Sequence, residues 1–342
     1  MNINQIIVDH GSNHHSSFSG YRRIISHINA DIVPSYPEKI PYRIRNFFCS
    51  KFVKNDIYYD SQSVEKEYQI FLKILHKKRE KILIHNLNGE RDLRYTLKFL
   101  SSMSSSLKFI SSFHKPIYLL EKIFKMNPYI KRIDGAIALG SNQRDFLINK
   151  FPSSRIKLIH HGVDTDFFKP RKKHIENKRK SILLVGQHLR DFELFNRVVD
   201  EIKNNNIDLN VVIHPSYIQF LRNKKFLNIF SGISNLKLKS LYQESSCLFI
   251  PFKNVVACNS ILESLACGTP IITNVVGDYS DYLDNNCAIF ANDKDSLIDS
   301  IMYIINTDQR KKMSLEARKK ALEFDLRLIS KKIQNFYHEM FL

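Results

Sequence analysis

The chain has 342 residues, 43% of them hydrophobic, and a formal net charge of +18. This length suffices for two domains of ordinary size, and no apolar run near 18 residues is present that would predict a transmembrane helix. The polar start MNINQIIVDHG is unlike a signal peptide, and five scattered cysteines without a C-x-x-C pair suit a reducing compartment, so we expect a cytoplasmic protein.

The positive charge is compatible with nucleic acid, an anionic membrane or a negatively charged substrate. Basic residues occur in short clusters, such as 77–79 and 178–180, without a nucleic-acid-binding motif around them. We therefore expect no nucleic-acid partner. Weak peripheral attraction to an anionic membrane is the better interpretation, at about 1 kcal/mol per basic residue near the lipid.

The first half alternates between strand and helix patterns. A strand over 5–8 precedes a polar stretch, Gly20 and a helical pattern over 21–28, and this order places a ligand at the carboxyl end of a strand. Two of the three histidines His10, His14 and His15 are four residues apart, but no further ligand stands at a diagnostic spacing, so no metal site is expected. Further strands are predicted over 81–85, 107–111, 133–139 and 156–159, and helices over 64–79, 91–100 and 142–150. His114 follows the strand over 107–111, although a lone histidine is usually structural.

A basic, aperiodic stretch over 169–180 predicts a linker. Beyond it, strands are predicted over 181–185, 209–214, 236–238, 248–252, 271–272 and 287–290, and helices over 260–267, 294–305, 309–321 and 326–341. The repeated alternation of strand and helix predicts an α/β fold with two doubly wound domains.

The stretch from Leu248 to Leu283 carries the strongest local signal, a strand, a loop, a helix that ends at Gly268, and a second strand. The N-terminus of such a helix favours a phosphate. Glu263, one turn into the helix, could accept hydrogen bonds from a ribose. It could equally complete a capping box with Ser260, because Ser-x-x-Glu is a common helix start.

Two motifs carry a family resemblance. The run ESLACGTPIITNVVG, Glu263 to Gly277, resembles the donor-site segment of GT-B glycosyltransferases, in particular the retaining family 4 (glycosyl transferases group 1) of bacterial surface-polysaccharide type. The segment His161 to Pro170, H-G-V-D-x-x-x-F-x-P, is similar to the hinge segment of the same family. Both stand in the expected order, which strengthens the resemblance.

The resemblance implies two facing Rossmann-like domains in the GT-B architecture. These would be an acceptor-side domain over 1–168, a linker over 169–180, a nucleotide-sugar domain over 181–325, and a C-terminal helix over 326–342 that packs back on the first domain. The implied reaction is hexosyl transfer, with retention, from a nucleotide-diphosphate sugar to a saccharide or lipid-linked saccharide. No cofactor beyond this co-substrate is implied. The chain would act in cell-surface glycan synthesis in the cytoplasm, at the inner membrane face.

The resemblance also assigns roles to residues. The donor would be bound by Gly20, Arg190, Asn259, Ser260 and Glu263. Catalytic roles would fall to His114, Arg190 and Glu263. Gly162 and Asp164 would lie at the hinge, where closure over 162–180 would exclude water.

Two departures from the family pattern keep an alternative open. Val255 stands where members carry a second glutamate, eight positions before Glu263, and no lysine follows Arg190 until Lys203. The alternative is a GT-B-like protein that binds a nucleotide sugar or a partner without turnover. For Arg190 itself, the alternative is a surface salt bridge with Asp191 or Glu193.

Overall fold

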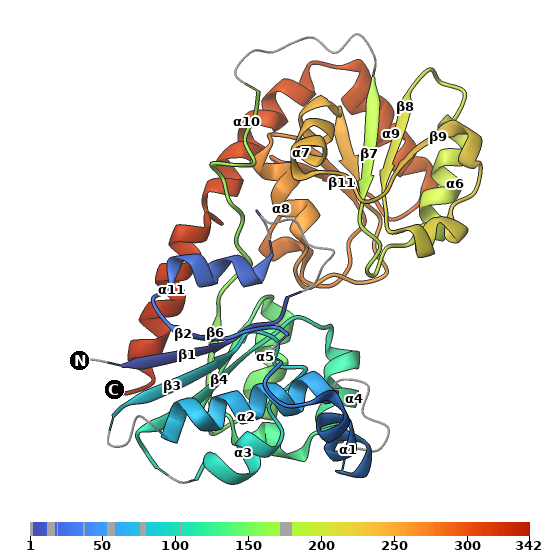
Figure 1. The fold of residues 1–342 in the computed structure, drawn as a ribbon. Coiled ribbons are helices and arrows are strands. Elements are labelled where there is room, and N and C mark those ends of the chain that lie inside the picture. The colour runs from blue at the N-terminus through green and yellow to red at the C-terminus, as the bar shows by residue number, and fades with distance from the viewer. Residues whose placement is uncertain are drawn as a thin grey trace. The chain divides into compact units, whose positions relative to one another are not determined.

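The structure is a computed structural model that describes residues 3–11, 18, 20–36, 38–52, 59–75, 80–102, 104–171 and 180–342. Backbone contacts divide the chain into two compact units (Figure 1). The first unit comprises Met1–His15, Tyr21–His160 and Arg327–Leu342, and the second comprises Ser16–Gly20 and His161–Leu326. Most of the predicted linker, 172–179, lies outside the described residues, and so do His14 and His15.

The first unit is built on a parallel sheet with the strand order β2-β1-β3-β4-β5-β6. Ile6 in the centre of β1 pairs with Asp31 of β2 on one side and with Ile84 of β3 on the other. Parallel strands covered on both faces consist of apolar runs, which explains why β3 is buried along its whole length. The strands are β1 Asn4–Val8, β2 Asp31–Val33, β3 Ile82–Asn86, β4 Leu107–Phe113, β5 Gly135–Ala138 and β6 Arg155–Leu158.

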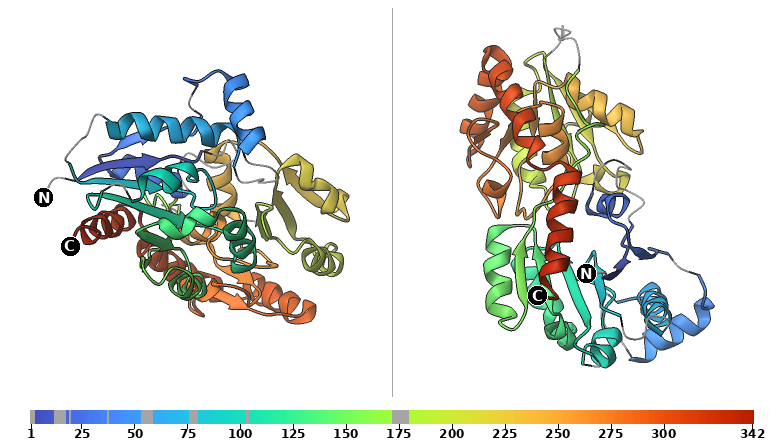
Figure 2. Two further views of the ribbon diagram at one scale, coloured as in Figure 1. Left: turned by 90° about the horizontal axis from the view of Figure 1, so that it is seen from below. Right: turned by 90° about the vertical axis from the view of Figure 1, so that its left-hand side faces the viewer.

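Helices cover this sheet, and the last of them comes from the C-terminal end of the chain. Figures 1 and 2 both show α11 (red) alongside the sheet of the first unit. The contact is close at Gly135, where an added Cβ would lie 3.1 Å from Phe336 Cζ of this helix. The helices are η1 Tyr21–His27, α1 Tyr42–Phe52, α2 Ser61–Leu75, α3 Tyr95–Leu100, α4 Ile117–Met126, η2 Pro128–Arg132, α5 Ser141–Lys150 and α11 Leu326–Glu339.

The second unit repeats the architecture, with the parallel order β12-β11-β10-β7-β8-β9. Its strands are β7 Ser181–Val185, β8 Asp208–Val212, β9 Leu227–Phe230, β10 Cys247–Phe249, β11 Ile271–Thr273 and β12 Ala288–Phe290. Its helices are α6 Phe192–Ile202, η3 Pro215–Phe220, η4 Lys224–Phe226, α7 Asn235–Glu244, α8 Asn259–Ala266, η5 Tyr279–Asp281, α9 Lys294–Asn306 and α10 Gln309–Leu322. The predicted fold class, α/β with two doubly wound domains, is confirmed.

Several predicted elements differ from those observed. The strand predicted over 236–238 is wrong, because the Ser234 hydroxyl accepts a hydrogen bond from Lys237 N (3.2 Å) and begins α7 instead. The helix predicted from 91 starts only at Tyr95, since Asp92 adopts a left-handed backbone with φ 72°. The segment 21–28 forms a 3₁₀ helix, η1. The prediction did not include α1, α4, β2 or β9.

Within the described part of the chain, no helix is both long enough and apolar enough to cross a bilayer.

Candidate active site

The topology of the second unit marks one place on its sheet. The chain moves outward from β7 to β8 and β9, and then returns to the other side of β7 with β10. In open α/β sheets, ligands bind at the carboxyl ends of the two strands where the order reverses. Here these strands are β7, followed by the loop 186–191, and β10, followed by the loop before α8. The two loops meet in a bridge between Arg190 and Phe252.

Arg190 points into the protein, with 7% of its surface exposed. Its Nη2 donates to Val185 O at 2.9 Å and to Ser260 Oγ at 2.8 Å, and its Nη1 donates to His188 O at 2.8 Å. The guanidinium also lies 4.6 Å from the ring centre of Phe252. The alternative of a surface salt bridge is wrong, because the guanidinium is turned toward α8 and because Asp191 caps α6 through Leu194 N (3.0 Å).

The N-termini of α8 and α10 have no side-chain cap among the described residues. Helices α6, α7 and α9 each begin with a side chain that accepts a hydrogen bond from the first turn. Helix α8 begins after Cys258, which makes no such capping bond within the described part of the chain. The first N–H groups of a helix have no acceptor inside the helix, and together with the helix dipole they favour an anion.

The capping box between Ser260 and Glu263 is wrong. Cys258 is the N-cap residue, so Ser260 is the second residue of α8 and Glu263 lies beyond the third. The Ser260 hydroxyl is bonded to Arg190 instead of to the helix backbone. A capping box requires the serine at the N-cap and the glutamate at the third helical position.

Glu263 is 3% exposed, and all residues of α8 from Ser260 to Ala266 are buried. Its Oε2 accepts a hydrogen bond from the Tyr242 hydroxyl at 2.8 Å. Burial first, and then the charge of Glu263, raise the pKa of Tyr242 well above its usual value, so this hydroxyl is a permanent donor. The sequence carried no sign of this partner, which lies in α7.

The hinge-like segment is joined to α8. His161 Nδ1 is 2.8 Å from Asn259 Oδ1, at the first residue of α8, and His161 N donates to the Tyr282 hydroxyl at 3.0 Å. Gly162 is buried. The Asp164 carboxylate accepts from Phe167 N at 2.9 Å, which closes a local turn. Asn259, Ser260 and Arg190 are therefore brought together, and their roles toward a donor stay predictions.

In the first unit, the strand order reverses between β1 and β3. His114 follows β4, its side chain is 22% exposed, and its Nδ1 lies 3.7 Å from Glu90 Oε2. Glu90 is buried and accepts hydrogen bonds from the backbone of His114 and from Lys115 N (2.7 Å). Burial would raise the pKa of Glu90, but the hydrogen bonds and charge of His114 outweigh burial and lower it. Tyr21 packs edge-on against His114, with ring centres 5.1 Å apart.

Gly20 precedes Tyr21 and has φ 93°, in the left-handed region that glycine tolerates. It is buried and is grouped with the second unit. A polar pair that the sequence analysis missed lies in the first unit. Lys66 Nζ is 2.8 Å from Asp92 Oδ2, and both side chains are almost fully buried. Among the described residues, no group of three His, Cys, Asp or Glu side chains could hold a metal ion.

Comparison with known proteins decides the family. Residues 166–320 match the family described as glycosyl transferases group 1. This segment, a little under half of the chain, identifies the second unit as a domain of the kind described as glycosyl transferases group 1. Its reaction class is therefore glycosyl transfer from a nucleotide sugar. No curated protein matches the sequence.

Solved structures share the fold of this glycosyltransferase. Sucrose-phosphate synthase from Thermosynechococcus elongatus is similar with a TM-score of 0.73 at 14% identity, covering 99% of both chains. WaaG, a glycosyltransferase involved in lipopolysaccharide biosynthesis, gives 0.66 at 13% identity over 97% of this chain and 99% of its own. HepE from Anabaena, in complex with UDP, gives 0.69 at 10% identity over 98% and 100%. These likenesses establish the GT-B fold.

The glycosyltransferase departs from the family pattern at a buried position. Val255 is 3% exposed and belongs to the apolar core of the second unit. Its backbone is closely covered, because its carbonyl accepts from Asp278 N at 2.8 Å and an added Cβ on Gly277 would lie 2.0 Å from that carbonyl. The loop before α8 is therefore fixed by backbone contacts and by an apolar side chain.

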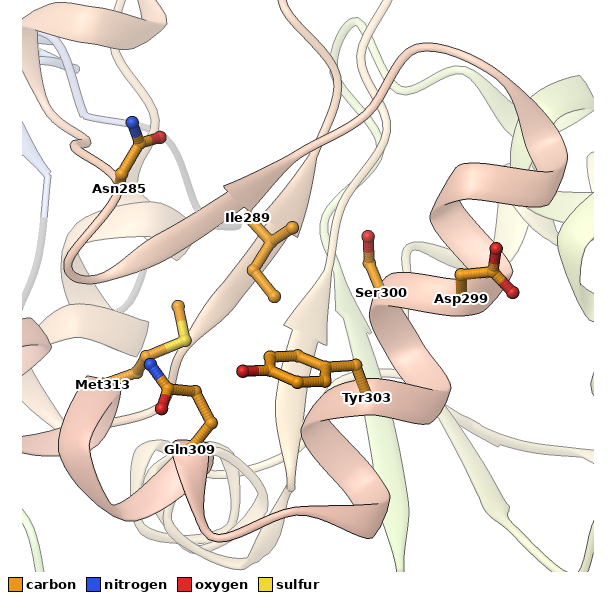
Figure 3. A pocket seen from close by; sticks show the side chains of 7 residues that line it. All are labelled: Asn285, Ile289, Asp299, Ser300, Tyr303, Gln309 and Met313. Carbon is orange, nitrogen blue, oxygen red and sulfur yellow. The ribbon is translucent and has the colours of Figure 1, made fainter.

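A cavity of about 450 Å³ lies elsewhere in the second unit of this glycosyltransferase. Figure 3 shows it between β12, α9 and α10, with Ile289, Tyr303 and Met313 in its wall. None of the predicted site residues lines it. Its lining contains no basic side chain, so it does not suit a diphosphate.

Proposed function

We propose that this glycosyltransferase moves a hexosyl group, with retention of configuration, from a nucleoside-diphosphate sugar to a saccharide or lipid-linked saccharide. The proposed setting is cell-surface glycan synthesis in the cytoplasm, with peripheral contact to the inner membrane. The observation that carries the proposal is the buried Arg190 guanidinium bonded to Ser260 at the start of α8, a helix without a side-chain cap.

The proposed chemistry follows from where charge develops. As the bond between the sugar and the diphosphate breaks, negative charge accumulates on the leaving diphosphate. Donors that are already oriented stabilise such charge most effectively, because they need no reorganisation during the reaction. The amides at the start of α8 and the guanidinium of Arg190 would supply them, and His161 would hold Asn259 in place through its 2.8 Å contact.

Roles are also proposed for Glu263 and His114. Glu263 would accept hydrogen bonds from the ribose hydroxyls, while Tyr242 holds its other oxygen. His114 would face the reacting sugar, oriented by Glu90. Among the structural neighbours, HepE is in complex with UDP and WaaG is involved in lipopolysaccharide biosynthesis, which supports a UDP-sugar and a surface glycan as the first candidates.

The alternative, binding without turnover, is favoured by one observation. Val255 fills with apolar atoms a position where the family carries a carboxylate. Both functions use the same nucleotide site, and they differ in whether a product forms.

A two-stage experiment tests the proposal. Thermal unfolding is measured with UDP, GDP and ADP, since a ligand at 100 times its Kd adds about 2.7 kcal/mol of stability. The sugar donors of any nucleotide that binds are then incubated with saccharide and lipid-linked acceptors, and product configuration is determined by NMR. A shift followed by a product supports the transferase, and a shift without any product supports the binder. If no nucleotide shifts the transition, the proposed donor site at α8 is wrong.

A further inference from the structure

The cavity between β12, α9 and α10 of the second unit combines an aromatic ring with apolar side chains. Figure 3 shows the ring of Tyr303 across its middle, with the hydroxyl directed toward Gln309 and Met313. Tyr303 is 49% exposed, whereas Met313 is 3% exposed. An accessible aromatic ring therefore lies beside a buried apolar side chain, in a cavity of about 450 Å³ that is large enough for a small ligand.

Polar side chains form the rest of the lining. Gln309 and Asn285 contribute amides and Asp299 contributes a carboxylate, and Figure 3 shows Asn285 and Asp299 at opposite ends of the cavity. The Ser300 hydroxyl donates to the α9 backbone at 2.7 Å and can still accept a hydrogen bond. The two amides, the carboxylate and the Tyr303 hydroxyl make no hydrogen bond or ion pair with another described residue. Their hydrogen-bonding capacity is available to a ligand.

The charge of the lining disfavours ionic ligands. It contains no basic side chain, so an anion would find no opposite charge there. A cation would meet a single exposed carboxylate, that of Asp299, while the net charge of +18 repels it. A purely apolar ligand would cover the amides and the carboxylate without replacing their hydrogen bonds to water. The lining therefore suits a neutral ligand that both donates and accepts hydrogen bonds.

A saccharide has this combination of properties. Its hydroxyl groups donate and accept, so they can pair with amides and also with a carboxylate, which only accepts. One face of a sugar ring presents C–H groups, and the negative face of an aromatic ring attracts their hydrogens. Tyr303 could hold a sugar ring in this way. Because Asn285 and Asp299 stand at opposite ends of the cavity, a short chain of sugars would reach both.

The cavity is separate from the proposed donor site of the same unit. Asn285 precedes β12, and Gln309 begins α10 after α9 has followed that strand. In a parallel sheet the helix after a strand leads back to the amino ends of the strands, so this part of the cavity lies toward the amino ends. Arg190 and the start of α8 follow the carboxyl ends of β7 and β10. A ligand in the cavity is therefore distinct from the nucleotide sugar.

We infer that this cavity binds a neutral saccharide, with Tyr303 beneath a sugar ring and with Asp299, Gln309 and Asn285 bonded to its hydroxyl groups. It is a second carbohydrate site of this glycosyltransferase, suited to retain a glycan chain. Only that use of the site, to keep a saccharide acceptor bound, rests on the proposed function. Saccharide binding itself requires neither a nucleotide nor transfer.

The test begins with the purified full chain on an array of neutral oligosaccharides of glucose, galactose, rhamnose and N-acetylglucosamine. The strongest ligand is then titrated in solution and followed by saturation-transfer NMR. Tyr303→Ala should weaken its binding about tenfold or more, because the aromatic ring is lost. Tyr303→Phe keeps the ring and should retain most of the affinity. Asp299→Ala removes one charged acceptor and should weaken binding several-fold.

A matched control is a second exposed tyrosine of the same unit. Tyr217 of η3 is 37% exposed and does not line the cavity, so Tyr217→Ala should leave saccharide affinity unchanged. The inference is overturned if no oligosaccharide of the array binds, or if Tyr303→Ala and Tyr217→Ala bind the ligand equally well. Both variants should keep the thermal shift by UDP. Saccharide binding that depends on Tyr303 in a protein without any nucleotide shift would support this inference and remove only the donor site.

Discussion

Arg190 is a charged residue that would be unfavourable in the interior without partners. Transfer of a guanidinium out of water is costly unless its donors are satisfied. Here two backbone carbonyls and the Ser260 hydroxyl satisfy them and fix its orientation. A guanidinium held in this way is oriented before a ligand arrives, which is the property that a diphosphate site requires.

The first prediction concerns this side chain. Arg190→Ala should weaken binding of UDP by about 2–3 kcal/mol, or roughly 30- to 150-fold, because a charge-assisted hydrogen bond is lost. Uridine, which lacks the diphosphate, should be affected far less. Calorimetric titration of both ligands measures the difference. Arg310→Ala, which removes another partly buried arginine bonded to Ser245 O, is the control and should leave UDP binding intact. Equal losses for UDP and uridine would remove Arg190 from the phosphate site.

The second prediction separates two functions of Glu263. Glu263→Gln keeps an oxygen that can accept from Tyr242, so its stability should remain near that of the wild type while nucleotide affinity falls. Tyr242→Phe removes the hydroxyl from a buried pair and should cost about 1–3 kcal/mol of stability, with nucleotide affinity largely kept. Urea unfolding and UDP titration of both variants test this. A Glu263→Gln protein that is merely less stable would show that the residue has only a structural role.

Among single residues, the sequence indicated candidate site residues where their position after a predicted strand, or their place in a family motif, marked them. His114 was singled out because it follows a buried strand, and Arg190 because the family resemblance implies an arginine near the first strand of the second domain. In the structure His114 directly follows β4, and Arg190 lies in the loop after β7. The partners could not be predicted. Glu90 and His114 are brought together by the sheet, and Tyr242 meets Glu263 across two helices. The helix start at Asn259 is set by Ser260 bonding to Arg190, a tertiary contact that a local capping pattern cannot reveal.

Among the elements, the loop between β10 and α8 depends on one backbone contact. Gly277 has φ 62°, and an added Cβ would lie 2.0 Å from Val255 O. Gly232 has nearly the same φ, 63°, but open space around the Cβ position. The two glycines therefore separate the effect of backbone conformation from the effect of a steric clash.

The third prediction uses this pair. Gly232→Ala should cost about 1–2 kcal/mol, the usual penalty of a left-handed residue. Gly277→Ala adds a clash with the backbone, so it should cost about 3 kcal/mol or more and weaken UDP binding by displacing the loop that leads to α8. Denaturant unfolding and nucleotide titration measure both effects. Similar stability losses in the two variants would show that the loop adjusts and does not fix α8.

The elements also show what periodicity can and cannot predict. Buried parallel strands were found because their sequences are short apolar runs between turns, as in β3, β7 and β11. Helix α7 was mistaken in part for a strand because Leu236-Lys237-Leu238 alternates, and the capping Ser234 decides otherwise. Helix α1 was missed because its aromatic residues do not form one buried stripe, and the structure shows them exposed.

At the scale of the molecule, each unit contains its own apolar core and buried polar groups. A hydrogen-bonded chain runs from the Tyr337 hydroxyl of α11 to His85 (2.5 Å), Ser112 (2.7 Å) and the Tyr21 hydroxyl (2.8 Å). It links the C-terminal helix with η1 through β3 and β4 in the middle of the sheet. Burial also shifts the pKa values of two groups in the first unit, His85 and Glu67. The two shifts make the stability change with pH in opposite directions.

The direction of each pH effect follows from the difference between the pKa in the folded protein and the pKa in the unfolded chain. Burial lowers the pKa of His85 to about 3, so its contribution is present above about pH 6.5 and is lost as pH falls toward 3, up to about 5 kcal/mol. Burial raises the pKa of Glu67 to about 7, against the hydrogen bonds from Tyr59, Thr96 and Arg94. Its contribution is present below about pH 4.5 and is lost as pH rises through 7, up to about 3 kcal/mol.

The fourth prediction is that these two slopes oppose each other between about pH 4.5 and 6.5 in the wild type. Glu67→Gln removes the falling slope, so its stability should rise with pH across this range. His85→Gln removes the rising slope, so its stability should fall with pH. Tyr337→Phe keeps His85 titratable and should lower stability by a similar amount at every pH. Urea unfolding at four pH values, followed by tyrosine signals because the chain has no tryptophan, measures each slope. If Glu67→Gln and His85→Gln tilt the profile in the same direction, the buried groups do not govern the pH response.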